Sequence, residues 1–396
     1  MFQELGPDAR ALLEIIAFFP QGVNENNLEW LFPTISNRTD IFDKFCILSL
    51  AHLNNGFYTM LAPLRDYLSP KDPMASPLLC TTKERYFDQL SVRIHPGKPS
   101  FEESRWITSD DVNVEHLLDV FTTFDANSEG VWGACHNFMV HLFWHKNRLT
   151  ILKPKIEGLP DDHPSKPACL FVLAKLFDSV RNWVERKRLL VCALDLWRGW
   201  GCDYEIALTL TEISATNSMI GLHEEGIQQA REALGIYERL GDTGDQADCL
   251  IKLAALLSSD KQFDAAEEAA FRAIYLLPEE GNQFRVCESH RVLGNIYESK
   301  GKIEKAIHHF GIAITIATSF NWDHGLFWAH YHLAHLFRHE GRFDDAQAHI
   351  EHAKLHAVDG THNLGCAMEE QAWAISKFVR GRSAPIFPRL ARYAVT

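Results

Sequence analysis

The second half of this chain repeats a sequence pattern every 40 residues, and this period constrains the fold more than any other feature. Small residues mark the register of the repeat at Gly226, Ala266, Ala306 and Ala346. A second series follows seven positions later, at Ala233, Ala273, Ala313 and Ala353. Periods of roughly 20–50 residues are typical of solenoids, in which each unit buries its apolar face only against its neighbours. We therefore expect equivalent units that stack through contacts at these small residues.

One unit, residues 293–310, shows the local structure that the pattern predicts. Apolar residues lie three and four positions apart in its first part, at Leu293, Ile296 and Tyr297. The same spacing recurs in its second part, at Ala306, Ile307 and Phe310. This spacing places each set on one face of a helix. Gly301 lies between the two sets, where a residue without Cβ can adopt the positive φ that often follows a helix end. The sequence therefore predicts two amphipathic helices joined by a tight turn.

These units resemble the tetratricopeptide repeat, which is a helix pair of about 34 residues. The resemblance covers residues 168–378 and implies an all-α protein built as an α-solenoid of helix hairpins. The longer period puts extra residues between units, for example at 276–283, and long units of this kind are typical of the sensor arrays of large signalling ATPases. We expect the repeat array to occupy residues 165–380 and residues 381–396 to form an irregular tail.

The N-terminal residues 1–70 predict a different domain. Apolar residues at helical spacing indicate three helices, at 8–19, 24–32 and 39–50. Asn24 is a plausible cap of the second helix. Two strand-like segments follow, at 49–53 and 57–61. Asn55 and Gly56 separate them and favour a tight hairpin turn, and Pro63 is well placed to start a further helix. Three helices followed by a two-stranded wing predict a winged-helix domain.

A second resemblance is carried by residues 12–33, LLEIIAFFPQGVNENNLEWLFP. They are similar to the first helices of the winged-helix domain in STAND-class nucleotide-switch proteins, which are NLR-like regulators, particularly the large fungal ones. In that family the winged helix follows an ATPase module and precedes a repeat array. Residues 60–66 fall where such proteins carry a Met-His-Asp-type motif, whose histidine touches bound ADP. Leu61 occupies the place of that histidine, so the resemblance implies no nucleotide contact from this residue.

A phosphate-binding loop of the form G-x-x-x-x-G-K-S/T is absent from the sequence. We therefore do not expect a complete nucleotide switch, and no cofactor is expected. The hypothesis is a scaffold and sensor for protein–protein interaction. It would be the winged-helix and repeat part of a STAND-type signalling regulator, without the ATPase module, which would act in cis or in trans. The alternative is a free-standing tetratricopeptide adaptor or co-chaperone.

Composition argues against several other classes of protein. The hydrophobic fraction of 46% is ordinary for a globular protein. No apolar run reaches the ~18 residues that span a membrane, and residues 11–19 lack the basic flank of a secretory signal. We therefore expect a cytoplasmic protein that binds no membrane. The formal net charge is −13, and the third N-terminal helix offers Arg38 and Lys44 against Asp40 and Asp43. This charge balance disfavours electrostatic binding to the phosphates of a nucleic acid, so we expect no nucleic-acid partner.

The middle of the chain predicts a less regular structure. We expect a loop or linker at residues 71–100, with helical spacing at 83–92. Residues 101–160 predict an irregular helical start of the solenoid. Its clearest helices are predicted at 114–121 and 131–144.

The sequence contains no recognisable catalytic constellation. There is no G-x-S-x-G elbow, and the nine cysteines include no C-x-x-C pair, so we expect reduced thiols. Two histidine sets lie at helical spacing, at His332, His335 and His339 and at His349, His352 and His356. No cysteine or carboxylate set completes a metal site beside them. His141 and His145 lack the glutamate of H-E-x-x-H. We therefore expect neither a metal site nor an enzyme.

The remaining candidate site is the concave groove of the array. In tetratricopeptide proteins, ligand contacts come from particular turns of each first helix. By register, the resemblance places such contacts at Lys175, Asp178, Thr211, Arg291, Asn295, Glu298, Tyr331, His335, Arg338 and His339. Packing does not require polar or aromatic groups at these positions. Arg291 with Asn295 resembles part of a clamp for C-terminal carboxylates, although its other members are missing. We expect the groove to bind a protein or peptide.

Overall fold

The structure is a computed structural model, and it describes residues 5–91, 105–125, 128–145, 152–177, 181–277 and 282–357. The chain divides into two compact units, residues 1–209 and residues 210–396, with the boundary inside one helix. Each unit is described by itself. Within the described residues, no helix combines the length and the apolar character needed to cross a bilayer.

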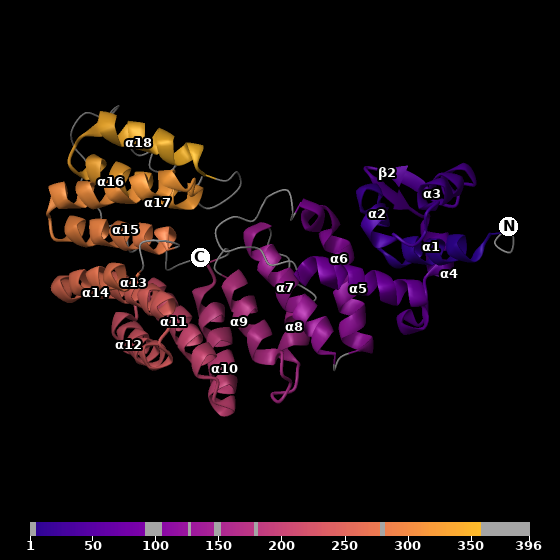
Figure 1. Cartoon of the computed structure of the whole chain (residues 1–396), viewed down its shortest axis with the longest axis horizontal. Coiled ribbons are helices and arrows are strands. Elements are labelled where there is room, and N and C mark those ends of the chain that lie inside the picture. Colours follow the sequence, from indigo (N-terminus) through magenta and orange to yellow (C-terminus); the bar gives the residue numbers. More distant parts are fainter. Residues whose placement is uncertain are drawn as a thin grey trace. The chain divides into compact units, whose positions relative to one another are not determined.

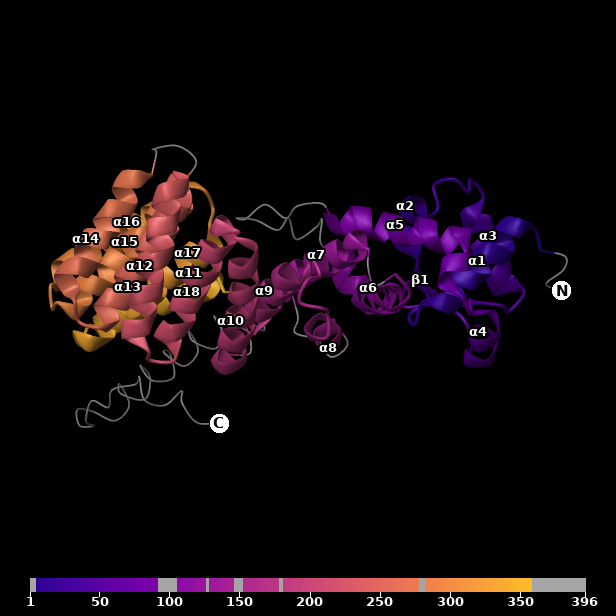
Figure 2. The same cartoon turned by 90° about the horizontal axis from the view of Figure 1, so that it is seen from below.

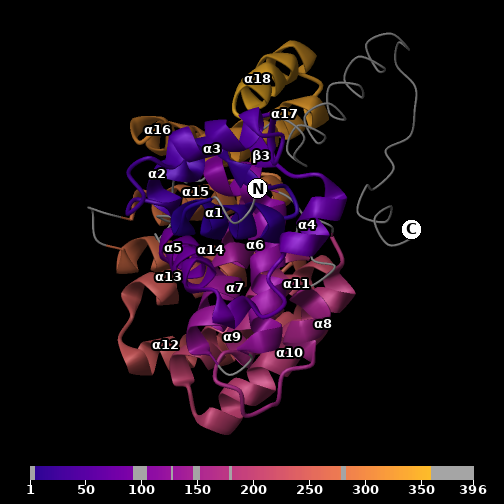
Figure 3. The ribbon, with the colours of Figure 1, turned by 90° about the vertical axis from the view of Figure 1, so that its right-hand side faces the viewer.

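The first unit begins with short helices and a small sheet. The elements are α1 (Pro7–Phe18), β1 (Val23–Asn24), the 3-10 helix η2 (Glu25–Asn27), α2 (Leu28–Leu31), α3 (Arg38–Ile47), β2 (His52–Asn54), β3 (Phe57–Thr59) and α4 (Ala62–Leu68). The three strands are antiparallel in the order β1-β3-β2. Figure 3 views this part of the chain, with α4 packed beside α1.

The strand β1 is an addition to the predicted two-stranded hairpin. Val23 pairs with Tyr58, and Leu53 pairs with the same residue from the other side. The predicted turn is confirmed, since Asn55 and Gly56 have φ values of 49° and 82°. Asn24 caps η2 through its side chain, which accepts a hydrogen bond from the backbone N–H of Asn26 at 3.0 Å. A two-residue strand is too short to produce the alternation of apolar and polar residues by which a strand is recognised.

The rest of the first unit is helical. Its elements are the 3-10 helix η3 (Pro73–Ala75), α5 (Pro77–Ser91), α6 (Arg105–Phe124), α7 (Glu129–His145), α8 (Leu152–Glu157), α9 (Lys166–Leu176) and α10 (Trp183–Trp200). The helix α5 lies inside the segment 71–100. It starts at Pro77, six residues before the helical spacing seen at 83–92. The predicted helices at 114–121 and 131–144 are confirmed as parts of α6 and α7.

The second unit is a series of helix hairpins. It follows α11 (Asp203–Met219), which contains the unit boundary, and comprises α12 (His223–Leu240), α13 (Thr243–Ser259), α14 (Phe263–Leu276), α15 (Gln283–Ser299), α16 (Ile303–Ser319), α17 (Asp323–His339) and α18 (Phe343–Leu355). The pairs α13–α14, α15–α16 and α17–α18 pack closely, and each pair contacts the next. In Figure 1 these hairpins follow one another from α12 to α18, and Figure 2 shows the same stack from below.

The small residues that defined the repeat occupy equivalent places. Each is the fourth residue of a second helix and each is buried: Gly226 in α12, Ala266 in α14, Ala306 in α16 and Ala346 in α18. The series seven positions later is also buried, at Ala233, Ala273, Ala313 and Ala353. The predicted α-solenoid of tetratricopeptide-like hairpins is therefore confirmed.

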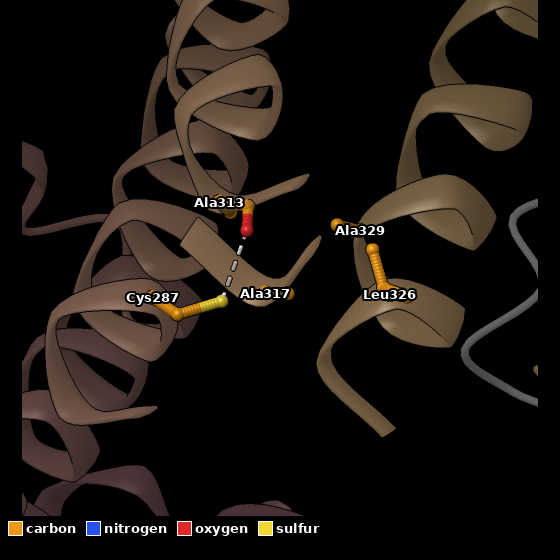
Figure 4. Close-up of a cluster of buried hydrophobic side chains, with 5 residues drawn as sticks. All are labelled: Cys287, Ala313, Ala317, Leu326 and Ala329. Carbon is orange, nitrogen blue, oxygen red and sulfur yellow. Dashed lines mark hydrogen bonds between the residues drawn. The ribbon is translucent and has the colours of Figure 1, made fainter. Parts of the chain in front are cut away.

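Small side chains allow three successive helices to meet at one core cluster. Figure 4 shows Ala313 and Ala317 of α16 between Cys287 of α15 and Leu326 of α17. The thiol of Cys287 donates to the backbone oxygen of Ala313, with 3.3 Å between Sγ and O. The methyl group of Ala329 completes the cluster. A larger residue on α16 would have to displace one of the flanking helices.

Turns with positive φ recur at intervals of 20 or 40 residues in the described part of the array. They lie at Gly201, Gly221, Gly241, Lys261, Gly301, Asn321 and Gly341, with φ values between 54° and 81°. The predicted positive φ of Gly301 is confirmed at 71°. The helices α10 to α13 and α15 to α17 therefore end in the same kind of left-handed turn, so the chain reverses direction after each of them in the same way.

Candidate functional site

The first helices of successive hairpins pack directly on one another, with α13 against α15 and α15 against α17. The side chains at the predicted contact positions of α15 and α17, and those at the equivalent positions of α13, therefore lie on one continuous surface, called here the first-helix face. It comprises Ile251, Ala255 and Ser258 of α13, Arg291, Asn295 and Glu298 of α15, and Tyr331, His335, Arg338 and His339 of α17.

A chain of polar contacts joins α15 to α17 at one end of the first-helix face. His335 Nδ1 lies 3.1 Å from Glu298 Oε1, so the two helices share a hydrogen bond at this level. His335 Nε2 lies 3.3 Å from His339 Nε2, which in turn lies 3.1 Å from Arg338 Nη2. Arg338 is only 6% exposed, whereas His339 is exposed. The structure therefore brings four of the predicted residues into mutual contact.

Arg291 forms a second polar contact between the same two helices. Its Nη2 atom lies 2.6 Å from Glu288 Oε2 in an ion pair on α15. Its Nη1 atom lies 3.3 Å from His332 Nε2 on α17. The ring of His332 is stacked on Phe310, with 5.6 Å between centroids and 4° between planes. Burial, followed by the charge of Arg291, holds the pKa of His332 well below its usual range, so this ring is neutral and accepts from the guanidinium.

Aromatic side chains line the N-terminal half of α17. The ring of Tyr331 stacks on Phe327 at 5.9 Å and meets Trp328 edge to face at 5.6 Å. Trp328 also lies 6.0 Å from His332. Phe327 is fully buried, but Trp328 and Tyr331 are half-buried and keep part of their surface accessible. This group therefore offers a ligand a large apolar surface with polar groups at its edges.

Asn295 has a carboxamide oxygen that is buried and makes no hydrogen bond within the described part of the chain. A buried polar atom without a partner is costly, by roughly 1–3 kcal/mol. The amide lies on α15 one turn from Arg291 and one turn from Glu298. A ligand that donated a hydrogen bond at this point would remove that cost.

Three predicted contact residues belong to neither α15 nor α17. Thr211 of α11 is 3% exposed, so little of it is accessible to a ligand. Lys175 belongs to the first unit, where its ammonium lies 5.7 Å from the ring centroid of Phe171. Asp178 lies outside the described residues. The structure therefore brings together the predicted residues of α15 and α17.

Three residues beside the first-helix face were not predicted. Trp328 and His332 belong to the aromatic group of α17, and Lys252 of α13 forms an ion pair with Glu212 at 2.8 Å. All three could have been recognised from the sequence. Trp328 and His332 lie three positions and one position from Tyr331, and Lys252 follows the position 40 residues after Thr211. The exposed face of a helix includes more than one residue per turn, whereas the prediction included only one or two.

The histidine sets do not converge on a metal in the described residues, where no three His, Cys, Asp or Glu side chains are arranged to hold one. His332 stacks on Phe310, and His335 lies beside His339 at 4.5 Å between centroids. His349 and His352 instead contact His330. The side chains of His141 and His145 lie outside the described residues.

Comparison with known proteins identifies the fold and no family. No family model matches the sequence, and no curated protein matches it. The crystal structure of a Rap protein complexed with competence and sporulation factor is similar, with a TM-score of 0.51 and 15% identity over 75% of this chain and 80% of that one. Similarity at this identity shows a shared fold of tetratricopeptide-like hairpins.

Two further solved structures are more distant. A STAND protein with a tetratricopeptide repeat sensor from Pyrococcus horikoshii gives a TM-score of 0.44 and 12% identity, over 96% of this chain and 65% of that one. Yeast Tom70 gives a TM-score of 0.43 and 12% identity, over 94% of this chain and 70% of that one.

Proposed function

We propose that this protein is an interaction sensor whose first-helix face binds a peptide or an extended segment of another protein. One observation carries the proposal: the same three register positions change from Ile251, Ala255 and Ser258 on α13 to Tyr331, His335 and Arg338 on α17. In α13 an isoleucine and two small residues satisfy the packing of the hairpin at these positions. Large polar and aromatic groups on α17 therefore have a reason other than the fold.

The kind of ligand follows from the chemistry of that face. Trp328 and Tyr331 present partly accessible rings, on which an apolar or aromatic side chain would pack. The buried oxygen of Asn295 has no hydrogen-bond donor in the described part of the chain, and a backbone N–H of an extended peptide would be a suitable one. The complex of the Rap protein with competence and sporulation factor shows that a protein of this fold can hold another molecule.

Selection from a displayed peptide library tests the proposal. Peptides selected on the full chain should lose binding by about tenfold or more when Tyr331 and His335 are both replaced by alanine, because truncation of a central aromatic residue typically costs ~2 kcal/mol. Tyr275→Ala is the matched control, since Tyr275 is 89% exposed on the second helix α14. Unchanged binding by the double variant would place the binding surface elsewhere.

We further propose that the N-terminal unit acts as a winged-helix hinge in a STAND-type regulator. The order α1, β1, α2, α3, β2, β3 supports this proposal, since it is three helices closed by a wing. Leu61, at the place of the Met-His-Asp histidine, is 65% exposed beside α4. The ATPase module would be supplied in cis or in trans. An in-frame ATPase segment upstream of Met1 in the genome would support it.

The alternative is an adaptor or co-chaperone that acts without a nucleotide switch. The absence of a phosphate-binding loop from the sequence favours it. The two functions make different demands on the N-terminal unit. A hinge must contact an ATPase module. An adaptor needs no such contact from residues 1–70 in order to bind its ligand. If the genome encodes no ATPase segment beside this chain, the adaptor function is favoured.

A further inference from the structure

Two successive hairpins carry a pair of histidines at the same place. His290 of α15 faces His309 of α16, with 3.0 Å between their Nδ1 atoms. Forty residues further on, His330 of α17 faces His349 of α18, with 2.9 Å between their Nδ1 atoms. We refer to these as the histidine pairs. Each one joins the first helix of a hairpin to the second.

Each histidine pair is enclosed by an aromatic ring from the first helix. Tyr297 stacks on His309, with 5.2 Å between centroids and 10° between planes. Phe337, at the equivalent position 40 residues later, stacks on His349 at 5.4 Å and 20°. His309 and His330 are each 9% exposed. The two sites are therefore copies of one arrangement, which limits access of water to the paired nitrogens.

The preceding hairpin shows that the fold does not require histidine here. The positions equivalent to the first pair are Leu250 of α13 and Ala269 of α14, and the ring position is Leu257. All three are buried and apolar. A leucine and an alanine therefore fill the same space between a first and a second helix, and the histidines add a property that packing alone does not need.

That property is sensitivity to protons. A contact between two Nδ1 atoms needs one ring to donate and the other to accept, so it holds only one proton. A proton on the acceptor nitrogen leaves two N–H donors facing each other and puts a positive charge in a poorly hydrated place. Burial, and then the charge of His309, lowers the pKa of His290 to about 4. Burial, and then the charges of His349 and His352, lowers the pKa of His330 to about 3.

The charged groups around the first pair do not offset a second proton. His308 and Lys305 of α16 add positive charge, and Glu267 of α14 adds negative charge. Glu267 is already engaged, since it accepts from the Tyr297 hydroxyl at 2.5 Å and from Lys300 at 2.7 Å.

The surroundings of the second pair are similar. His352 and His356 of α18 and its neighbour Arg342 add positive charge. Asp345 is the negative group near His349, and its carboxylate lies 2.7 Å from Arg342 Nε. His356 in turn lies 2.9 Å from Asp323 of α17. The carboxylates near the two pairs, Glu267 and Asp345, are thus already paired with Lys300 and Arg342.

We propose that the histidine pairs make α15–α16 and α17–α18 an acid-sensitive section of the array, in which mildly acidic solution favours separation of the first helix of each hairpin from the second, because the opened rings bind protons that the closed pairs exclude. The hairpin α13–α14 has no histidine pair and stays closed in acid. Opening of these two hairpins would disrupt the contacts between α15 and α17, which carry the first-helix face. The proposal concerns closure of the hairpins and does not depend on which ligand that face binds.

Hydrogen exchange of the full chain at pH 7.5 and pH 5.0, corrected for the intrinsic exchange rate, tests the proposal. Protection of amides in α15–α18 should fall by about tenfold or more at the lower pH, whereas amides in α13–α14 should change much less. The matched variant copies the preceding hairpin, with His290→Leu and His309→Ala, and with His330→Leu and His349→Ala. It should keep its protection at pH 5.0.

Two further variants keep the test decisive. His308→Asn removes an exposed histidine next to His309 but leaves both pairs intact, so it should keep most of the response to acid. His309→Asn with His349→Asn puts an uncharged amide near the Nδ1 position, and should reduce the response even if the apolar variant fails to fold. The proposal is overturned if α13–α14 opens as much as α15–α18, or if the asparagine pair leaves the response unchanged.

Discussion

The ring of Phe310 occupies the space that a side chain on Gly294 would need. A Cβ atom built on Gly294 would lie 2.4 Å from Phe310 Cε1, well inside van der Waals contact. Gly294 lies on α15 and Phe310 on α16, so this contact sets how closely the two helices of the hairpin approach. Phe310 is fully buried, which leaves its ring no free direction in which to move.

Gly294→Ala should therefore destabilise the second unit by about 1–3 kcal/mol, the usual cost of overpacking a core. Gly311→Ala is the matched control, because Gly311 lies on α16 and a Cβ there would meet no atom within 4 Å. Alanine in an open helical position should stabilise by about 0.5–1 kcal/mol. Urea denaturation monitored by circular dichroism measures both changes. Equal effects of the two substitutions would show that the helix approach is not limited by Phe310.

Lys261 occupies a turn where the other repeats mostly use glycine. Its φ is 63°, and the equivalent turns at Gly241, Gly301 and Gly341 have φ values of 75°, 71° and 76°. A side chain in this conformation brings Cβ close to the carbonyl oxygen, at a cost of about 1 kcal/mol. Lys261→Gly should therefore stabilise the array by about 0.5–1 kcal/mol, because the added freedom of the unfolded chain offsets part of the gain.

The opposite substitution provides the control for that prediction. Gly301→Ala should destabilise the array by about 1 kcal/mol, since it introduces the same strain into a turn that lacks it. Denaturation midpoints in urea should move in opposite directions for the two variants, with unchanged slopes. A loss of stability in Lys261→Gly would mean that contacts of the lysine side chain outweigh the strain in its backbone.

The fold of the second unit was predictable because its determinants are local and repeated. The register of Ala266, Ala306 and Ala346 follows from the need for close helix contact, and that need appears in the sequence as the absence of large side chains. Gly301 shows the same principle for a turn. A signal repeated several times is stronger than any single motif, which is why the array could be read from one chain.

The contacts of the first-helix face could not be predicted in the same way. That His335 meets Glu298, and that Arg291 meets His332, depends on the distance and rotation between α15 and α17. The 40-residue period fixes which turns face the same way, but not which side chains touch. The strand β1 was missed for a related reason, since its pairing with β3 across Val23 and Tyr58 joins residues far apart in the sequence.

The cysteines should differ in reactivity according to their burial. Burial raises the pKa of Cys287 to about 12 and that of Cys249 to about 11, and each thiol donates to a backbone oxygen within its hairpin contacts. Cys192 and Cys202 are only partly buried. Iodoacetamide at pH 8 should therefore modify Cys192 and Cys202 well before the other two, because the thiolate is the reacting species.

Peptide mapping by mass spectrometry at successive times measures these rates. In denaturant, the four thiols should react at similar rates, which provides the control. Rapid modification of Cys287 in the folded protein would show that the cluster with Ala313 and Leu326 opens readily.

Asp110 is a buried carboxyl group at the centre of a polar network in the first unit. It accepts hydrogen bonds from the Tyr86 hydroxyl, from Asn27 at 3.2 Å and from Asn113 at 2.6 Å. Asn113 also donates to the backbone oxygen of Gly22 at 2.8 Å, so the network ties α6 to the N-terminal helices and sheet. Burial raises the pKa of Asp110 to about 6, although the three hydrogen bonds favour the charged form.

The raised pKa of Asp110 determines the direction in which the stability of the first unit changes with pH. The folded state holds its proton up to about pH 6, whereas an unfolded Asp loses it near pH 4. The stabilisation is therefore fully present below pH 4 and is lost as the pH rises to about 6, by roughly 2–3 kcal/mol in total. His116 in the same unit acts in the opposite direction, because burial lowers its pKa. The contribution of Asp110 is therefore measured as the difference in the free energy of unfolding between the unmodified chain and a variant at position 110.

Asp110→Asn should remove this dependence on pH. The gap in stability between the unmodified chain and Asp110→Asn should shift by about 2–3 kcal/mol in favour of the variant between pH 4 and pH 7, as measured by hydrogen exchange of amides in α5 and α6. Asp111→Asn is the control, since Asp111 is the neighbouring residue, is only half-buried and should leave the pH dependence intact. A constant gap would mean that Asp110 is ionised at pH 5 in the folded protein, and that its three hydrogen bonds outweigh its burial.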